Sequence, residues 1–111
     1  PNNMVIEVSS FFTRTASLET IQALTDCEGY MLSFEQMNNL FHTIPDFREF
    51  GRAMLVRGFA AFKQRTLSMI TQTAEERYVA LLSASPELVQ HVPVKYIASY
   101  LGITDTSLSR I

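Results

Sequence analysis

The sequence 93-PVKYIASYLGITDTSLSRI-111 holds the clearest structural pattern in the chain. Pro93 suits the first turn of a helix, and Gly102 can adopt the left-handed backbone that ends one. Thr104 is a favourable N-cap for a second helix. Ala98 lies four residues before Gly102, where two steeply crossing helices need a small side chain. The pattern therefore predicts two short consecutive helices that cross at Ala98.

A small residue, a glycine four residues later and apolar residues beyond it are typical of a helix-turn-helix, whose second helix enters the major groove of DNA. An ordinary helical hairpin is the alternative. The apolar seam between the two helices would consist of Ile97, Leu101, Ile103, Leu108 and Ile111.

Two capping boxes predict helix starts upstream of this stretch. Ser33 with Gln36 would open a short helix through about residue 41, and Thr73 with Glu76 would open another through about residue 83. A further short helix is expected over residues 87–91, between two prolines.

A long helix is predicted between these boxes. Pro45 and Asp46 suit its first turn, and no proline follows until after residue 72. At about 25 residues it would be ~40 Å long, more than twice the mean helix length. Such a helix must lie against more than its own small domain.

The long helix has two apolar lines, which suggest one face packed on its own chain and another on a partner. Gly51 and Gly58 are seven residues apart, and each costs about 1 kcal/mol against alanine unless another helix approaches closely. A helix wholly buried in a monomer is the alternative. One line holds Phe47, Phe50, Met54 and Ala61, and the other holds Leu55, Phe59, Phe62, Thr66 and Ile70. The residues expected at a homodimer interface are Phe47, Phe50, Gly51, Met54, Gly58, Ala61 and Phe62.

Residues 4–33 predict short strands. The runs 4-MVIEV-8, 20-TIQALT-25 and 30-YML-32 are rich in β-branched or alternating apolar residues, and 26-DCEG-29 is a turn signal. The expected fold class is therefore α+β, with a hairpin ahead of the helices.

Composition limits the possible functions. The chain has 111 residues and a net charge of −2, and this acidic balance counts against strong DNA binding by the stretch alone. Its single cysteine, Cys27, is expected to be a small buried residue. No apolar run approaches about 18 residues and no signal peptide is visible, so we expect a cytoplasmic protein without a membrane contact.

Catalytic and metal-binding patterns are absent from the sequence. There is no glycine-rich phosphate loop, and His42 and His91 have no carboxylate or cysteine set at ligand spacing. We therefore expect neither an enzyme nor a metal protein.

The sequence resembles regulators of the Crp/Fnr family over nearly its whole length. The segments 73-TAEERYVALL-82 and 92-VPVKYIASYLGITDTSLSRI-111 resemble the family's linker helix and DNA-binding helices. Residues 44–47 resemble the start of its central dimer helix, and residues 11–33 are similar to the last strands of its cyclic-nucleotide-binding β-roll. The resemblance implies part of a degenerate β-roll over residues 1–44, a dimerisation helix over 45–72 and a partial helix-turn-helix over 73–111.

The resemblance also implies a lost effector site. In the family, a Gly-Glu pair followed ten residues later by Arg-Ser or Arg-Thr grips the cyclic phosphate. Here Glu7 follows Ile6, and the arginine position falls on Ser17, followed by Leu18. Without a guanidinium there is no bidentate phosphate clamp, so we expect no ordinary cyclic AMP binding and leave the effector unidentified.

On the second helix of the pair, the resemblance implies that Arg110 contacts DNA and that Asp105 and Thr106 occupy the other base-contacting positions. The hydroxyls of Thr104, Ser107 and Ser109 are candidates for phosphate contacts. A solvated surface charge is the alternative for Arg110.

Since the sequence ends inside the expected recognition helix, we expect a piece of a longer protein, which on domain-size grounds would have roughly 200 residues. The predicted function is a homodimeric regulator that binds double-stranded DNA, with RNA polymerase as a further partner implied by the resemblance. The competing prediction is an effector-sensing or dimerisation module that binds no DNA.

Overall fold

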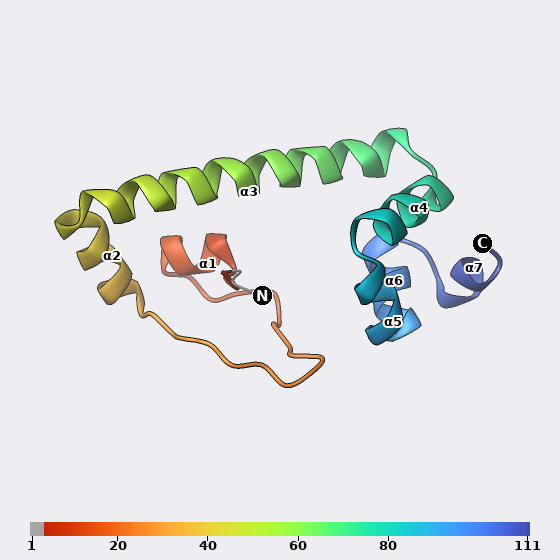
Figure 1. The fold of residues 1–111 in the computed structure, drawn as a ribbon, viewed down its shortest axis with the longest axis horizontal. Coiled ribbons are helices and arrows are strands. Elements are labelled where there is room, and N and C mark those ends of the chain that lie inside the picture. Colours follow the sequence, from red (N-terminus) through yellow and green to blue (C-terminus); the bar gives the residue numbers. More distant parts are fainter. Residues whose placement is uncertain (1–3) are drawn as a thin grey trace. The chain divides into compact units, whose positions relative to one another are not determined.

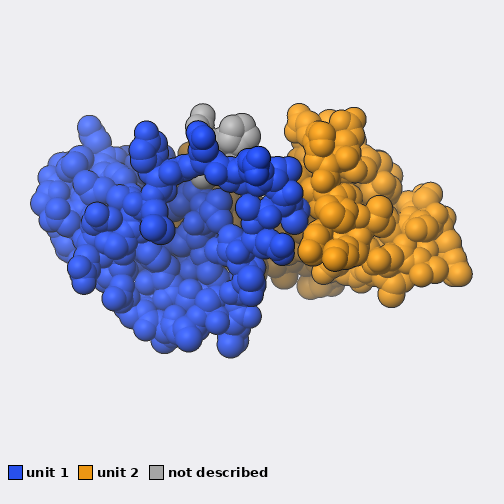
Figure 2. Space-filling model, turned by 90° about the horizontal axis from the view of Figure 1, so that it is seen from below, with its two compact units in different colours: residues 1–53 blue, residues 54–111 orange. Residues whose placement is uncertain are grey.

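The computed structural model of the chain describes residues 4–111. Over this range the chain forms seven α-helices and no β-strand, in the order drawn in Figure 1. Two compact units divide it, residues 1–53 and residues 54–111, coloured separately in Figure 2. Each unit is described by itself below.

The predicted α+β fold class is wrong, because residues 4–111 contain no sheet and hence no end of a β-roll. The expected strand over residues 4–8 gives way to helix α1 (Val8–Thr13). Glu7 is the N-cap of this helix, since its carboxylate accepts hydrogen bonds from the amides of Ser9 at 3.0 Å and Ser10 at 2.8 Å. A side-chain acceptor followed by free backbone amides is a helix-start signal, and it prevails over the β-branched residues around it.

The two other expected strands are also missing. Residues 14–33 contain neither helix nor strand, and their apolar side chains lie in water, with Tyr30 107% exposed and Met31 93% exposed. Cys27, expected to be buried, is exposed. A hairpin is stable only when one face is covered, and no strand in residues 4–111 is available to cover this one.

The first unit is held together by aromatic contacts. Helix α2 (Phe34–Thr43) begins with the predicted capping box, in which Ser33 and Gln36 each accept from the other's backbone amide. The Phe34 ring packs edge-on against Phe11 of α1 at a centroid distance of 5.7 Å, and the Arg14 guanidinium lies 4.4 Å above it. Met37, 5% exposed, is the buried apolar residue of this unit.

The predicted long helix is confirmed as α3 (Pro45–Thr71), which has 27 residues. Figure 1 draws it between α2 and α4. Within residues 4–111, no helix combines the length and the apolar character that crossing a bilayer requires.

The second unit contains the last part of α3 and four shorter helices. These are α4 (Ala74–Ala84), α5 (Pro86–His91), α6 (Val94–Leu101) and α7 (Asp105–Ser109). The predicted capping box of Thr73 and Glu76 opens α4, with hydrogen bonds of 2.8 and 3.2 Å. Four buried residues form the core of this unit, and partly buried residues of α4 and α5 surround them: the core is Ile97, Ala98, Leu101 and Leu108.

The N-cap at Glu7 should make the stability of α1 depend on pH. Hydrogen bonds from Ser10 are the main cause, and one from the Ser9 amide a smaller cause, of a Glu7 pKa below its ordinary value of 4.5. The stabilising contribution of this cap is therefore fully present above pH 4.5 and is lost as the pH falls through the lowered pKa of the folded state. In a titration followed by NMR, the Glu7 carboxyl and the Ser9 and Ser10 amides should share one transition below pH 4.5.

The matched control is Glu7→Gln, which keeps the side-chain shape and removes the titrating group. The Ser9 and Ser10 amide signals of this variant should not shift in the same pH window. A Glu7 transition at or above pH 4.5 would contradict the cap.

Candidate nucleic-acid interface

The turn between α6 and α7 is fixed by the backbone of Gly102. This residue has φ 75° and ψ 31°, in the left-handed region that L side chains rarely adopt. Its amide donates to the carbonyl of Ser99 at 3.1 Å, and the next amide, of Ile103, donates to the carbonyl of Ala98 at 3.0 Å. This pair of bonds is a Schellman motif, which satisfies two of the carbonyls left free at the end of α6.

The small residue Ala98 is buried in the core that α6 and α7 share. Ala98 is 0% exposed, and Leu101 and Leu108 are 2% and 8% exposed. Because the Schellman motif directs Ile103 back toward the core, α7 starts only four residues after α6 ends. Residues 94–109, the α6–α7 pair, therefore have the two-helix geometry that the sequence predicts.

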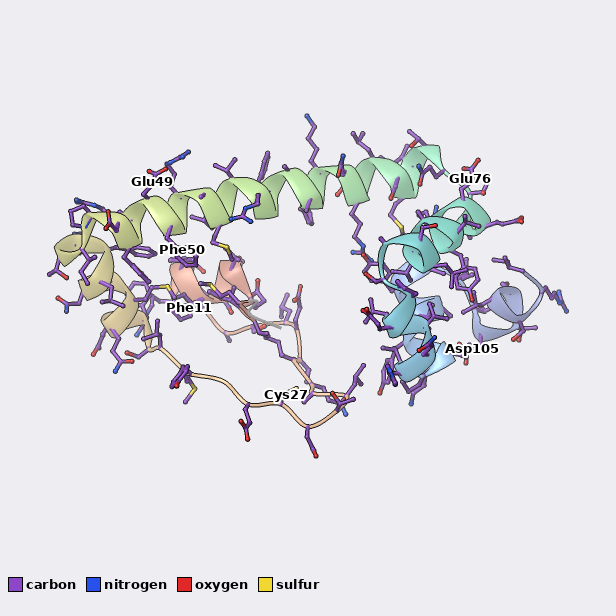
Figure 3. All side chains as sticks on the ribbon, viewed as in Figure 1. Phe11, Cys27, Glu49, Phe50, Glu76 and Asp105 are labelled. Carbon is purple, nitrogen blue, oxygen red and sulfur yellow. The ribbon has the colours of Figure 1, made fainter. Side chains whose placement is uncertain are left out.

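All six residues predicted to contact DNA are exposed. Helix α7 buries Leu108, and Thr106 and Arg110 lie one turn apart on the face opposite it. The charged residue in the first turn of α7 is Asp105, which is labelled in Figure 3. Its carboxylate interacts favourably with the positive end of the helix dipole and can accept a hydrogen bond from cytosine.

The hydroxyls on α7 differ in what they can still donate. Thr104 accepts from the Ser107 amide at 3.2 Å and donates to the Ser107 hydroxyl at 2.9 Å. Ser109 donates to the carbonyl of Asp105 at 3.0 Å. A phosphate accepts hydrogen bonds only, so Thr104 and Ser109 have already used the proton it would need. Donors that remain free of partners among residues 4–111 belong to Thr106, Ser107 and Arg110.

Charge is distributed unevenly between the two units. Residues 54–111 hold six Lys and Arg against four Asp and Glu, whereas residues 1–53 hold three against seven. The ion pair found among residues 4–111, between Arg52 and Glu49, lies in the first unit. The unit that contains the α6–α7 pair therefore has a positive excess, although the whole chain is acidic.

The residues expected at the effector site do not form a clamp. Glu7 is engaged in the α1 cap, Ser17 forms hydrogen bonds with the backbone of Glu19 at 2.9 and 3.0 Å, and Leu18 is 103% exposed. Arg14, the nearest guanidinium in the sequence, lies over the Phe34 ring. No group of His, Cys, Asp and Glu side chains within residues 4–111 could hold a metal ion.

The residues expected at a dimer interface fall into two groups. In the first unit, Phe47 packs against Phe41 of α2 at a centroid distance of 5.0 Å, and Phe50 packs against Phe47 at 6.1 Å. A Cβ on Gly51 would lie 2.5 Å from the Phe41 ring, so a contact within the chain already accounts for this glycine. In the second unit Met54 is partly buried, Ala61 and Phe62 are exposed, and a Cβ added at Gly58 would meet nothing within 4 Å.

The second apolar line of α3 is uncovered. Leu55 is 50% exposed, Phe59 71%, Phe62 67% and Ile70 76%. Together with Thr66 these residues form the α3 stripe, whose spacing of four, three, four and four residues follows one face of the helix.

Sequence reasoning missed two arginines that contact the end of α6, Arg65 and Arg77. Arg77 donates to the carbonyl of Leu101 at 2.7 Å, and Arg65 donates to the carbonyl of Tyr100 at 2.9 Å. Arg65 and Tyr100 are 35 residues apart in the sequence, and Arg77 and Leu101 are 24 residues apart. No local sequence pattern connects either pair.

Comparisons with protein-family models, with curated proteins and with solved structures found no match.

Gly102→Ala tests the turn. The left-handed region costs alanine about 1–2 kcal/mol, so we expect the free energy of unfolding to fall by that amount. The added Cβ meets only the flexible end of Met69, at 2.9 Å, so strain in the backbone is the main cause. Denaturant unfolding of the whole chain, followed by far-UV circular dichroism, measures the change.

Two further variants separate backbone strain from other effects. Gly102→Asn should recover part of the loss, because asparagine tolerates the left-handed region better than alanine. Gly29→Ala is the matched control, since its Cβ would meet nothing within 4 Å and its φ is not positive. Equal stability of Gly102→Ala and the unchanged chain would mean that α6 does not end in this way.

Proposed function

We propose that the α6–α7 pair binds the major groove of double-stranded DNA through the exposed face of α7, in a homodimer joined along α3. The observation that carries the proposal is the Schellman motif at Gly102, which turns α7 away from α6 and leaves Thr106 and Arg110 in water. Arg110 can make a bidentate contact to guanine, and Thr106 and Ser107 can donate to phosphate or base.

The net charge of the second unit is compatible with DNA binding. The six Lys and Arg of residues 54–111 form no ion pair, so none of them is neutralised by a carboxylate of residues 4–111. Neutralising phosphates is the main source of affinity in most protein–DNA complexes. The modest size of the excess favours a protein that needs two copies to bind tightly.

The α3 stripe supports assembly with a second copy of the chain. Its first four members recur at intervals of four, three and four residues, which place side chains in the seam of a two-stranded coiled coil, and Ile70 follows four residues later on the same side of the helix. Two parallel α3 helices would bring two α6–α7 pairs to the same end of the dimer, as a site with two half-sites about 34 Å apart requires. From α3 onward this arrangement is the one that the resemblance to Crp/Fnr regulators implies, whereas residues 4–111 contain no β-roll.

Selection from a pool of random DNA duplexes tests the DNA contact with the full chain. We expect an enriched sequence with two related half-sites, bound less tightly as salt is raised. Arg110→Ala should weaken binding to that sequence by about 5- to 150-fold, the equivalent of about 1–3 kcal/mol, because one bidentate base contact is lost. Fluorescence anisotropy measures both affinities.

The matched control is Arg57→Ala, which removes the same charge from an exposed position on α3. It should change binding to the enriched sequence far less than Arg110→Ala does. Equal losses for the two variants, or no enrichment at any salt concentration, would refute the DNA proposal.

Sedimentation equilibrium tests the homodimer. The full chain should form a dimer, and Phe59→Ser should raise its dissociation constant by about tenfold or more, because burying one phenylalanine is worth about 1.5–3 kcal/mol. Val79→Ser, which alters an exposed apolar residue of α4 outside the stripe, should leave the dissociation constant unchanged. A chain that stays monomeric at high concentration would rule out the α3 contact.

The second candidate is a dimerisation module that binds no DNA. The same α3 stripe favours it, since this surface needs a partner whether or not α7 contacts a nucleic acid. A stable dimer together with failed DNA selection would support this candidate over the first.

A further inference from the structure

Arg77 of α4 contacts the ends of two other helices. Its Nη1 atom donates to the carbonyl of Gln72 at 2.6 Å and reaches the carbonyl of Ser68 at 3.4 Å, at the end of α3. Its Nη2 atom donates to the carbonyl of Leu101 at 2.7 Å, the last residue of α6. Its Nε atom is buried without a hydrogen-bond partner among residues 4–111, so the guanidinium is inserted between the helices.

The Gln72 and Leu101 carbonyls lack ordinary helical partners, whereas the Ser68 carbonyl already accepts from the Gln72 amide at 3.0 Å. The last four carbonyls of a helix have no amide of the same helix to bind, and they carry the negative end of its dipole. Neither α3 nor α6 has a basic residue in its own last turn. One planar guanidinium therefore supplies the positive charge and the donors that both helix ends need, in a geometry that a lysine ammonium cannot reproduce.

A second contact joins the same two helices. Arg65 of α3 donates to the carbonyl of Tyr100 at 2.9 Å, and its guanidinium lies 4.1 Å above the Tyr100 ring. The Met69 side chain reaches the Gly102 turn, where its Cε atom would lie 2.9 Å from an added Cβ. Side chains of α3 and α4 thus meet at the one point where α6 ends and the turn to α7 begins.

We propose that Arg77 and Arg65 are positioning residues that fix the direction of the α6–α7 pair relative to the last turns of α3. They touch no DNA themselves. The inference rests on the proposed function for its consequence: in a dimer joined along α3, these contacts would set the distance between the two DNA-contacting helices. With them loosened, each α7 could still bind a half-site, but the two would no longer match one spacing.

A label-to-label distance tests the positioning role without DNA. Spin labels are placed on the full chain at Gln64→Cys of α3 and Ser109→Cys of α7, with the native thiol removed by Cys27→Ser and with unlabelled chain in excess. We expect one narrow distance distribution by electron–electron double resonance. Arg77→Lys and Arg65→Gln should each broaden it, while far-UV circular dichroism shows unchanged helix content.

Arg57→Gln is the matched control on α3, since it removes the same charge from an exposed site with no hydrogen-bond partner among residues 4–111. It should leave the distribution narrow. If Arg77→Lys fails to fold, Arg65→Gln, altered at an exposed side chain, decides the question. An unchanged distribution in every folded variant at these two positions overturns the proposal.

Half-site spacing gives the DNA readout. On duplexes that carry two copies of the selected half-site, the folded variants should lose about fivefold or more of the preference for one spacing, the lower end of the coupling usual between linked sites. Binding to a single half-site should be unchanged, which a general loss of stability would not produce. Failure of the unchanged chain to bind any duplex refutes the proposed function, and the distance measurement still decides the positioning role.

Discussion

The backbone at residue 102 has to be left-handed, and the arrangement of residues 94–111 depends on that constraint. A right-handed residue there would let α6 continue, and the α7 side chains would follow the same rod. With Gly102 at φ 75°, the backbone leaves the right-handed helical conformation, and the Ile103 amide donates to the carbonyl of Ala98. Thr104 can then cap a new helix. Exposure of one face of α7 follows from this single conformation.

The core that this turn completes is small. Five apolar residues are buried among those described, and four of them lie around the α6–α7 crossing. A core of this size stabilises a chain only modestly, so local interactions carry much of the specification of the fold. Backbone groups at the helix ends are satisfied by two capping boxes, the Schellman motif and the arginine contacts. Without these interactions such groups would bind water or have no partner.

The structural features that could be predicted from the sequence are those that depend on a few neighbouring residues. Three signals marked helix boundaries correctly because each acts on its own backbone neighbours: Ser33 with Gln36, Thr73 with Glu76, and Gly102. The alternation in residues 20–25 was misleading, since period two indicates a strand only where another strand pairs with it.

Longer-range features were beyond sequence patterns. Gly51 is explained by the Phe41 ring of the preceding helix, and its spacing from Gly58 alone could not distinguish that contact from one with a second chain. Arg65 and Arg77 resemble any other surface arginine in the sequence, because their partners are backbone carbonyls, which carry no side-chain signal. The sequence predicted that the six candidate DNA contacts on α7 would be exposed. It did not predict that the Thr104 and Ser109 hydroxyls would donate their protons to groups of the same segment.

The long segment between α1 and α2 has a consequence for the lifetime of the chain. Residues 14–33 present exposed backbone in no regular structure, and proteolytic cleavage concentrates in such segments. Cleavage should therefore start in this segment, before any of the helices is attacked. After one cut, α1 would stay with the rest of its unit only through noncovalent contacts such as those at the Phe34 ring, so retention of the N-terminal helix would become a binding equilibrium that dilution shifts.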